Sequence, residues 1–510
     1  MTETPTASST GTPRWAAHLP PGTDPADVDL LADGTLVAAW TRRWAAGPER
    51  PVLHTVEHGW WTAAHLEEAS RRVAGRLVAA GLERGDRVLM SAASSAELVA
   101  AHVGALRAGL VVIPANTAYQ QREIAHLVND GSPRAAVVDD ETRAGWLRAA
   151  DPSLVVTSPA VELPDGPDPA WLDDVGAGEP AVIGYTSGTT GAPKGAVLTH
   201  ANTLASAAAL RIAWRWSPDD RLVLALPLFH AHGLMVGLHG TLLAGASAVL
   251  QHGFDADRVL DAVAEHSATL FFGVPTMYAR FAASPRIGEL AALRLCVSGS
   301  APLPPSIFET IAGRGGQRPL ERYGMTETLM NVSNPHDAER RPGTVGFPLP
   351  GVEVKLAGGN EGEILLRGPN VFGGYWRNPD ATAKAFDDDG WFRSGDLGTF
   401  DDDGYLAIVG RSKELIITGG YNVYPREVEE VLLRRPEVVE VAVAGTPSEE
   451  WGEVVTAYVV CDGDLDREAF DALAAESLAS YKRPRLVHVV DAIPKNALGK
   501  VLRHELAPPA

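Results

Sequence analysis

The chain has 510 residues and carries 44 lysine and arginine residues against 64 aspartate and glutamate residues, which gives a formal charge of −20. This acidic balance excludes a generally basic nucleic-acid-binding protein. Apolar residues make up 45% and charged residues 21% of the chain. At roughly 100–200 residues per domain, the length allows two to four domains and a sizeable core.

Cysteine usage indicates a reducing compartment. Cys296 and Cys461 are the only cysteines, too few for a disulfide framework in a chain of this length. The N-terminal segment shows no basic stretch ahead of an apolar run, so we expect no signal peptide. No stretch of about 20 apolar residues indicates a membrane span. We therefore expect a cytoplasmic protein.

The first part of the chain alternates between strand-like and helix-like patterns. Residues 1–24 are rich in Thr, Ser, Pro and Gly, a composition that predicts a flexible tail. Strand-like segments at 87–92 and 110–114 flank a helical run, and Ser94 to Glu97 has capping-box spacing before that helix. This alternation predicts a parallel sheet covered on both faces.

The texture of the sequence changes twice further along. A second alternating block spans about 180–340. From about 342 to 409, short strand-like runs between Gly, Pro and Asp turns predict a small β-rich unit. After Gly410 the pattern predicts a compact α+β segment.

The sequence YTSGTTGAPKG at 185–195 has three glycines and four Ser or Thr hydroxyls, and it ends in Lys194 and Gly195. Backbone N–H groups and hydroxyls of such a loop can surround phosphate oxygens. The loop is not a Walker A loop, because Gly follows the lysine. The alternative is an ordinary surface loop. The candidate nucleotide-binding residues of this loop are Thr186, Ser187, Gly188, Thr189, Thr190, Gly191 and Lys194.

A second candidate is the segment ERYGMTET at 321–328. Tyr323 offers a ring for stacking, Gly324 allows close backbone approach, and Thr326 adds a hydroxyl. Glu327 suits Mg²⁺, which takes carboxylate oxygens together with substrate phosphates. Alone, the carboxylate is equally compatible with a solvated turn.

Two further segments carry candidate polar residues. In SGDLG (394–398), Asp396 can accept hydrogen bonds from ribose hydroxyls, and Arg411 follows the last strand of the β-rich unit. In PKNALGK (494–500), Lys500 lies close to the C-terminus. Lysine is scarce in this arginine-rich chain and not interchangeable with arginine, which favours a chemical role for individual lysines. The seven lysines are Lys194, Lys355, Lys384, Lys413, Lys482, Lys495 and Lys500.

Together with GRSKELIITGGYNVYPREVE (410–429), these segments in this order resemble the adenylate-forming superfamily of acyl-CoA synthetases, luciferases and peptide-synthetase adenylation domains. The resemblance covers about residues 25–505. It implies a multi-domain α/β protein: an N-terminal domain (25–409) of two α/β sheets and a small β-barrel, a hinge (410–413) and a mobile C-terminal domain (414–510).

The resemblance also implies an activity. Such enzymes use ATP and Mg²⁺ to convert a carboxylic acid to acyl-AMP with release of pyrophosphate, and then transfer the acyl group to coenzyme A. Two alternatives stay open: a ligase that loads a carrier protein, and a nucleotide-binding protein without turnover. The expected partners are small molecules, with neither nucleic acid nor a membrane; the protein could be a monomer or a homodimer.

The resemblance assigns roles to individual residues. Tyr323 would stack near the adenine, Thr326 would approach the α-phosphate, and Glu327 would hold Mg²⁺. Asp396 and Arg411 would contact the ribose. The implied catalytic residues are Lys500, Glu327, Thr326 and Thr186. The implied hinge and coenzyme A residues are Lys413, Gly419, Gly420 and Tyr421.

The acyl pocket has features similar to malonyl-CoA synthetases. The candidate acyl-site residues are His230, Arg280, Ser300, Arg322 and Met325. A buried arginine could pair with a second carboxylate, which favours malonate or methylmalonate. Arg280 could instead point to solvent, and Arg322 could pair with Glu321 or a residue of another segment. A larger fatty, aromatic or natural-product acid is then the alternative.

Overall fold

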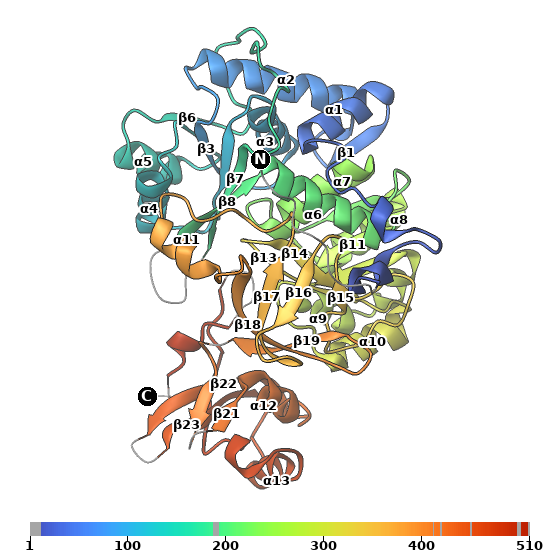
Figure 1. Cartoon of the computed structure of the whole chain (residues 1–510), viewed down its shortest axis with the longest axis vertical. Helices are drawn as coiled ribbons and strands as arrows, with labels where there is room; N and C mark the ends of the chain where they lie inside the picture. The colour runs from blue at the N-terminus through green and yellow to red at the C-terminus, as the bar shows by residue number, and fades with distance from the viewer. Residues whose placement is uncertain are drawn as a thin grey trace.

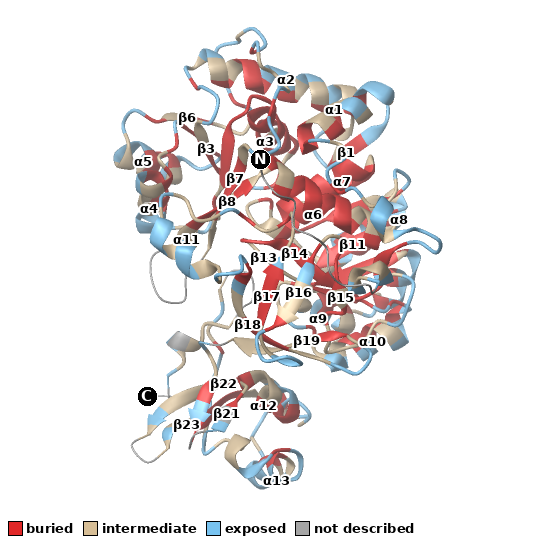
Figure 2. Cartoon of the chain, in the orientation of Figure 1, coloured by how far each residue is buried: buried red, intermediate tan, exposed pale blue. Residues whose placement is uncertain are grey.

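The computed structural model describes residues 12–186, 193–411, 413–418, 421–448, 451–496 and 501–507. Figure 1 shows that the chain up to β19 (Leu406–Arg411) forms the larger part of the molecule, and that the remaining chain forms a smaller unit at its lower end. Buried residues fill the larger part and a separate centre within the smaller unit (Figure 2). Among the residues described, no helix is long and apolar enough to cross a membrane.

A six-stranded sheet has the strand order β6-β5-β3-β4-β7-β8. Its strands pair in parallel except for β8, which is antiparallel to β7. Neighbouring residues of β3 enter different hydrophobic clusters, Val88 on one face and Leu89 on the other, so both faces are buried as predicted. The strands are β3 (Arg87–Ser91), β4 (Val111–Pro114), β5 (Ala135–Val138), β6 (Val155–Thr157), β7 (Pro180–Thr186) and β8 (Lys194–Thr199). The helices of this region are α2 (Ala63–Ala79), α3 (Ala96–Arg107), α4 (Gln121–Gly131) and α5 (Glu141–Ala150).

Helix α3 shows how the local sequence starts and packs one of these helices. Its N-cap is Ser95, whose side chain accepts a hydrogen bond from Leu98 N at 3.1 Å. The helix therefore starts one residue later than the predicted capping box at Ser94 implies. A Cβ added to Gly104 would lie 2.4 Å from Ser70 O, so only glycine allows α3 to approach α2 this closely.

A nine-stranded sheet has the order β15-β14-β13-β12-β11-β9-β10-β1-β2. The central strands are parallel, and β2, β14 and β15 join them in antiparallel pairs. The strands are β1 (Pro51–Thr55), β2 (Gly59–Thr62), β9 (Arg221–Leu224), β10 (Ser247–Leu250), β11 (Leu270–Gly273), β12 (Leu295–Ser298), β13 (Leu320–Met325), β14 (Leu329–Ser333) and β15 (Phe347–Pro348). The helical segments are α1 (Leu36–Ala46), α6 (His200–Ala213), the π-helical turn His232–Leu238, α7 (His239–Ala244), α8 (Ala256–His266), α9 (Pro275–Ala283), the 3₁₀ segment Ile287–Ala292 and α10 (Pro305–Gly315).

The β-rich unit is an antiparallel sheet with the order β16-β17-β18-β19. No ladder joins its outer strands β16 and β19 within the described chain, so the expected small barrel is present as an open four-stranded sheet. Its elements besides β19 are β16 (Glu353–Leu356), β17 (Glu361–Arg367), α11 (Pro379–Ala385) and β18 (Phe392–Phe400).

The C-terminal unit has a hydrophobic cluster of its own, which includes Val428, Val443 and Phe470. Tyr424 of this unit donates to Glu361 Oε1 of β17 at 2.9 Å, and Arg426 donates to the Ile408 backbone oxygen. Its elements are β20 (Ile416–Thr418), β21 (Tyr421–Val423), α12 (Pro425–Leu432), β22 (Val438–Ser448), β23 (Gly452–Cys461), α13 (Arg467–Ser477), the 3₁₀ turn Ser480–Lys482, β24 (Leu486–Val489) and the 3₁₀ turn Arg503–Glu505.

Regular structure begins within the segment that composition predicts to be a flexible tail. Residues Arg14–His18 form a 3₁₀ helix, and Pro25–Asp27 form another. His18 is buried, with its Nε2 atom 3.1 Å from the Phe347 backbone oxygen. The expected flexible tail of residues 1–24 is thus wrong at its C-terminal end, because tertiary contacts order a segment of loop-like composition.

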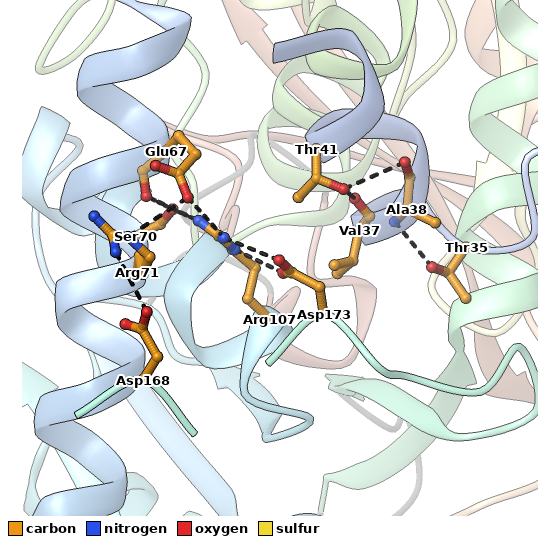
Figure 3. Close-up of polar contacts among 10 residues, drawn as sticks. All are labelled: Thr35, Val37, Ala38, Thr41, Glu67, Ser70, Arg71, Arg107, Asp168 and Asp173. Atoms are coloured by element: carbon orange, nitrogen blue, oxygen red, sulfur yellow. Dashed lines mark hydrogen bonds and ion pairs between the residues drawn. The ribbon is translucent and has the colours of Figure 1, made fainter. Parts of the chain in front are cut away.

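Arg107 shows how this fold accommodates a buried arginine (Figure 3). Its side chain is 2% exposed. The Nε and Nη2 atoms donate to the two oxygens of Asp173 at 2.7 and 3.0 Å, and Nη1 donates to Ser70 Oγ at 2.9 Å. Glu67 supplies two further acceptors. The buried guanidinium of Arg107 is therefore surrounded by acceptors.

Candidate active site

The end of β13 and the turn after it bring the segment around Tyr323 next to the six-stranded sheet. A Cβ added to Gly184 of β7 would lie 2.4 Å from Thr326 Cγ2, so Thr326 packs directly against that strand. A Cβ on Gly324 would lie 2.1 Å from Leu329 O, and only glycine fits there. The candidate segments near positions 186 and 326 are therefore neighbours in space.

The two ends of the candidate phosphate loop lie on neighbouring strands. Thr186 is the last residue of β7, and it pairs in register with Lys194, the first residue of β8. Lys194 Nζ lies 4.9 Å from the centroid of the Tyr375 ring. The remaining candidates of the loop lie outside the described residues: Ser187, Gly188, Thr189, Thr190 and Gly191.

Glu327 is a buried carboxylate, 6% exposed. Its Oε1 atom accepts a hydrogen bond from the Tyr375 hydroxyl at 2.9 Å. Burial raises the pKa of Glu327, and the Tyr375 hydrogen bond and the charge of Arg411 oppose that rise. The described residues contain no group of three or more His, Cys, Asp or Glu able to hold a metal. A single carboxylate near a phosphate loop fits Mg²⁺, which takes much of its coordination from substrate phosphates and water.

Asp396 connects two other predicted residues, Tyr323 and Arg411. The Tyr323 hydroxyl donates to Asp396 Oδ2 at 2.6 Å, and Arg411 Nε pairs with Asp396 Oδ1 at 2.9 Å. Asp396 is 4% exposed. Burial, together with the Asp396 charge, raises the pKa of Tyr323, so its hydroxyl remains a donor. Asp396 lies in the middle of β18 and pairs in register with Arg411, the last residue of β19.

Some of the acyl-site candidates lie near one another in the structure, and others do not. Arg322 is 4% exposed, and a Cβ on Gly299 would lie 2.4 Å from its Cζ atom, so the guanidinium lies against the Gly299 backbone. Burial and the nearby Arg322 charge lower the pKa of His230 to about 4. Ser300 Oγ lies 3.4 Å from His232 Nδ1, and the Arg322 charge also lowers the pKa of His232.

Arg322 lacks the acceptors that surround Arg107. Its Nε and Nη2 atoms are buried and have no hydrogen-bond partner within the described structure. Burial lowers the pKa of Arg322 to about 9. The alternative pairing with Glu321 does not occur: the Glu321 carboxylate accepts from Leu303 N at 3.2 Å, and neighbouring residues of a strand point to opposite faces.

Arg280 is exposed, which corrects its assignment as a buried pocket residue. It lies in the last turn of α9, whose buried residues are Tyr278 and Phe281, and at helical spacing residue 280 faces away from them. Its Cζ atom lies 6.0 Å from the Phe254 ring centroid. Met325 is partly buried, with its sulfur 3.9 Å from the Tyr323 hydroxyl.

The hinge and coenzyme A candidates are described in part. Lys413 is exposed and lies in the turn between β19 and β20. Tyr421 is 59% exposed and stacks on Tyr481, with ring centroids 4.6 Å apart. Gly419, Gly420 and the catalytic candidate Lys500 lie outside the described residues.

Tyr375 joins the candidate site although no sequence pattern singles it out. Its hydroxyl contacts a carboxylate 48 positions away, and its ring contacts Lys194. The local sequence GGYW offers no chemical signal for either contact, because a tyrosine between glycines and tryptophan also fits an ordinary loop.

Comparison with known proteins agrees with this arrangement. A family model described as AMP-binding enzyme matches residues 40–376, and one described as AMP-binding enzyme C-terminal domain matches residues 427–500. A feruloyl-CoA synthase from Amycolatopsis is 38% identical over 89% of this chain and 96% of its own length. A malonate–CoA ligase from Arabidopsis thaliana is 34% identical over 84% of this chain and 78% of its own.

A solved structure has the same fold over most of the chain. The crystal structure of ATP-bound MatB from Rhodopseudomonas palustris is 39% identical, covers 92% of this chain and 98% of its own, and aligns with a TM-score of 0.86. The family match, the two-part fold and the grouping of Thr326, Glu327 and Asp396 point to one class of enzyme. The chain belongs to the AMP-binding enzyme family and is an acid–CoA ligase of the adenylate-forming superfamily.

Proposed function

We propose that the enzyme activates a short acid with a second carboxylate, malonate or methylmalonate, and transfers it to coenzyme A. The observation that carries this proposal is the buried guanidinium of Arg322, whose Nε and Nη2 atoms lack acceptors in the described part of the chain. A buried charge without a partner is costly, so an anionic ligand is the natural partner. In Arg107 the same Nε–Nη2 edge binds both oxygens of Asp173, the geometry a substrate carboxylate would reproduce.

The first step joins the acid to the nucleotide. The reacting carboxylate attacks the α-phosphorus of ATP, and the bond to pyrophosphate breaks, which gives acyl-AMP. Thr186 and Lys194, at the ends of the phosphate loop, would hold the departing pyrophosphate, and Lys500 would bridge the reacting groups. Glu327 would hold Mg²⁺, which neutralises phosphate charge in such reactions.

The nucleoside would be held by Tyr323 and by Asp396, the carboxylate that Tyr323 and Arg411 both contact. The Tyr323 ring would stack near the adenine, while Asp396, fixed by Tyr323 and Arg411, would accept from the ribose hydroxyls. Positioning of this kind supplies much of the rate enhancement in nucleotidyl transfer.

The second step uses coenzyme A. Its thiol attacks the acyl carbonyl, AMP leaves, and the thiol proton is released. The C-terminal unit would rotate about residues 410–413 at Lys413, removing Lys500 and bringing the loop with Gly419, Gly420 and Tyr421 to the pantetheine arm. The separate hydrophobic cluster of this unit supports such a movement as a rigid body.

Pyrophosphate release over a panel of acids tests this proposal. We expect malonate and methylmalonate to give the highest kcat/KM, with medium-chain, aromatic and polycyclic monocarboxylic acids far below them. The alternative, a larger monocarboxylic acid, is favoured by the 38% identity to a feruloyl-CoA synthase. A preference for ferulate-like acids would overturn the dicarboxylate proposal. Thioester formation with coenzyme A and with a carrier protein, measured side by side, identifies the acceptor of the second step.

A further inference from the structure

Tyr375 touches two groups of the candidate active site at once. Its hydroxyl donates to Glu327 Oε1 at 2.9 Å, and its ring centroid lies 4.9 Å from Lys194 Nζ. A cation over an aromatic face at this distance is attracted to the ring. One side chain therefore contacts both the carboxylate assigned to Mg²⁺ and the lysine assigned to the phosphates.

The backbone of Tyr375 is held against the strand that follows the phosphate loop. Trp376 N donates to Gly195 O at 2.7 Å, and Tyr375 forms an antiparallel bridge with Ala196 of β8. The Tyr375 N–H donates to Thr382 Oγ1 at 2.9 Å. The bridge to Ala196 and the hydrogen bond to Thr382 thus hold the Tyr375 backbone beside the start of β8.

Glu327 needs a partner of this kind. The carboxylate is 6% exposed, and its backbone oxygen accepts from Phe372 N at 2.9 Å. That backbone bond holds the main chain and does not involve the carboxylate. A hydroxyl donor at Oε1 restricts the torsions of the carboxylate and stabilises the charged form that a cation requires.

We propose that Tyr375 is a positioning residue for adenylation: its hydroxyl orients the Glu327 carboxylate toward the cation of MgATP, and its ring holds Lys194 beside it. This inference rests on the proposed role of Glu327 as the Mg²⁺ ligand. Hydrogen-bond partners of metal ligands typically contribute roughly 10- to 100-fold to metal affinity or activity.

The substitution Tyr375→Phe removes the hydroxyl and keeps the ring. In the full-length protein with a non-hydrolysable ATP analogue, electron paramagnetic resonance titration with Mn²⁺ should show affinity about 10-fold or more weaker than the parent. The Mg²⁺ concentration for half-maximal pyrophosphate release should rise in parallel. The double variant Tyr375→Phe, Glu327→Gln should bind Mn²⁺ no more weakly than Glu327→Gln alone.

Tyr405→Phe is the matched control. The Tyr405 hydroxyl donates to the Glu339 backbone oxygen at 2.8 Å, away from the candidate residues, so this variant should bind Mn²⁺ like the parent. Parent-like affinity in Tyr375→Phe, with Glu327→Gln impaired, would overturn the positioning role and leave the metal assignment standing. Parent-like affinity in both variants would overturn the metal assignment itself. The acid panel decides the dicarboxylate proposal independently of either result.

Discussion

Tyr323 donates its hydroxyl proton to Asp396 Oδ2 at 2.6 Å, while the other oxygen of that carboxylate pairs with Arg411. Asp396→Asn should raise the KM for ATP by about 10-fold or more, because hydrogen bonds to a charged group contribute about 1.5–3 kcal/mol. Pyrophosphate-release kinetics measure this. Tyr323→Phe keeps the ring and should have a smaller effect. An unchanged KM for ATP in Asp396→Asn would contradict a role in nucleotide binding.

Arg322 and Arg107 should respond oppositely to replacement by methionine. Arg322→Met should lower kcat/KM for malonate by about 30-fold or more, the loss of a paired buried charge. It should leave the free energy of unfolding unchanged or raised, because an unpartnered buried charge is removed. Arg107→Met should instead destabilise the fold by about 3 kcal/mol. Urea unfolding and the malonate assay give the two readouts, and equal destabilisation in both variants would argue for a structural role of Arg322.

Gly184→Ala tests the contact between β7 and the turn that carries Thr326. The new Cβ would meet Thr326 Cγ2 at 2.4 Å, so Thr326 or the turn that carries it must shift. A displacement of about 1 Å at a reacting centre can cost about 100-fold in rate. We expect strongly reduced pyrophosphate release, with little change in the circular dichroism spectrum. Full activity would show that the position of Thr326 is not critical.

Three buried histidines should make the stability of the fold depend on pH. His102 and His239 are stacked with their Nε2 atoms 2.8 Å apart, so they share one proton between these atoms. Burial lowers the pKa of His102 to about 3, that of His200 to about 4, and that of His239 well below 6.5. The folded state therefore keeps these rings neutral where the unfolded state is protonated.

The sign of the effect follows from those directions. Stability is fully present above pH 6.5 and is lost as the pH falls from 6.5 toward 4. Each such histidine should lower the free energy of unfolding by about 2 kcal/mol at pH 5 relative to pH 7. Urea unfolding at the two pH values checks this. His200→Leu should weaken the pH dependence, since both ring nitrogens of His200 are buried without a partner in the described structure. An equal pH dependence in that variant would contradict the assignment.

Lys500→Ala should separate the two half-reactions. We expect loss of acyl-AMP formation with thioester formation from supplied acyl-AMP largely retained, because the proposed role of Lys500 is confined to the first step. Pyrophosphate release and coenzyme A consumption measure the two steps. Equal loss of both would refute this division.

The parallel arrangement of the strands could be predicted from the sequence, because the strand-like segments at 87–92 and 110–114 are separated by a helical run. The exposure of Arg280 becomes clear only from the packing of α9, whose buried residues Tyr278 and Phe281 place residue 280 on the opposite face. The link from Tyr375 to Glu327 joins distant segments through tertiary pairing, and no local pattern encodes it. The order at Arg14–His18 likewise comes from contacts with a distant strand.

The alternation of side chains along β13 has a consequence for protein engineering. Glu321 and Arg322 face opposite sides of one strand, and Tyr323 follows directly. In the proposed function Arg322 binds the acid's distal carboxylate, whereas Glu321 accepts from Leu303 N and Tyr323 donates to Asp396. A library randomised at position 322 alone would therefore test new carboxylic acid substrates without changing the contacts of Glu321 and Tyr323.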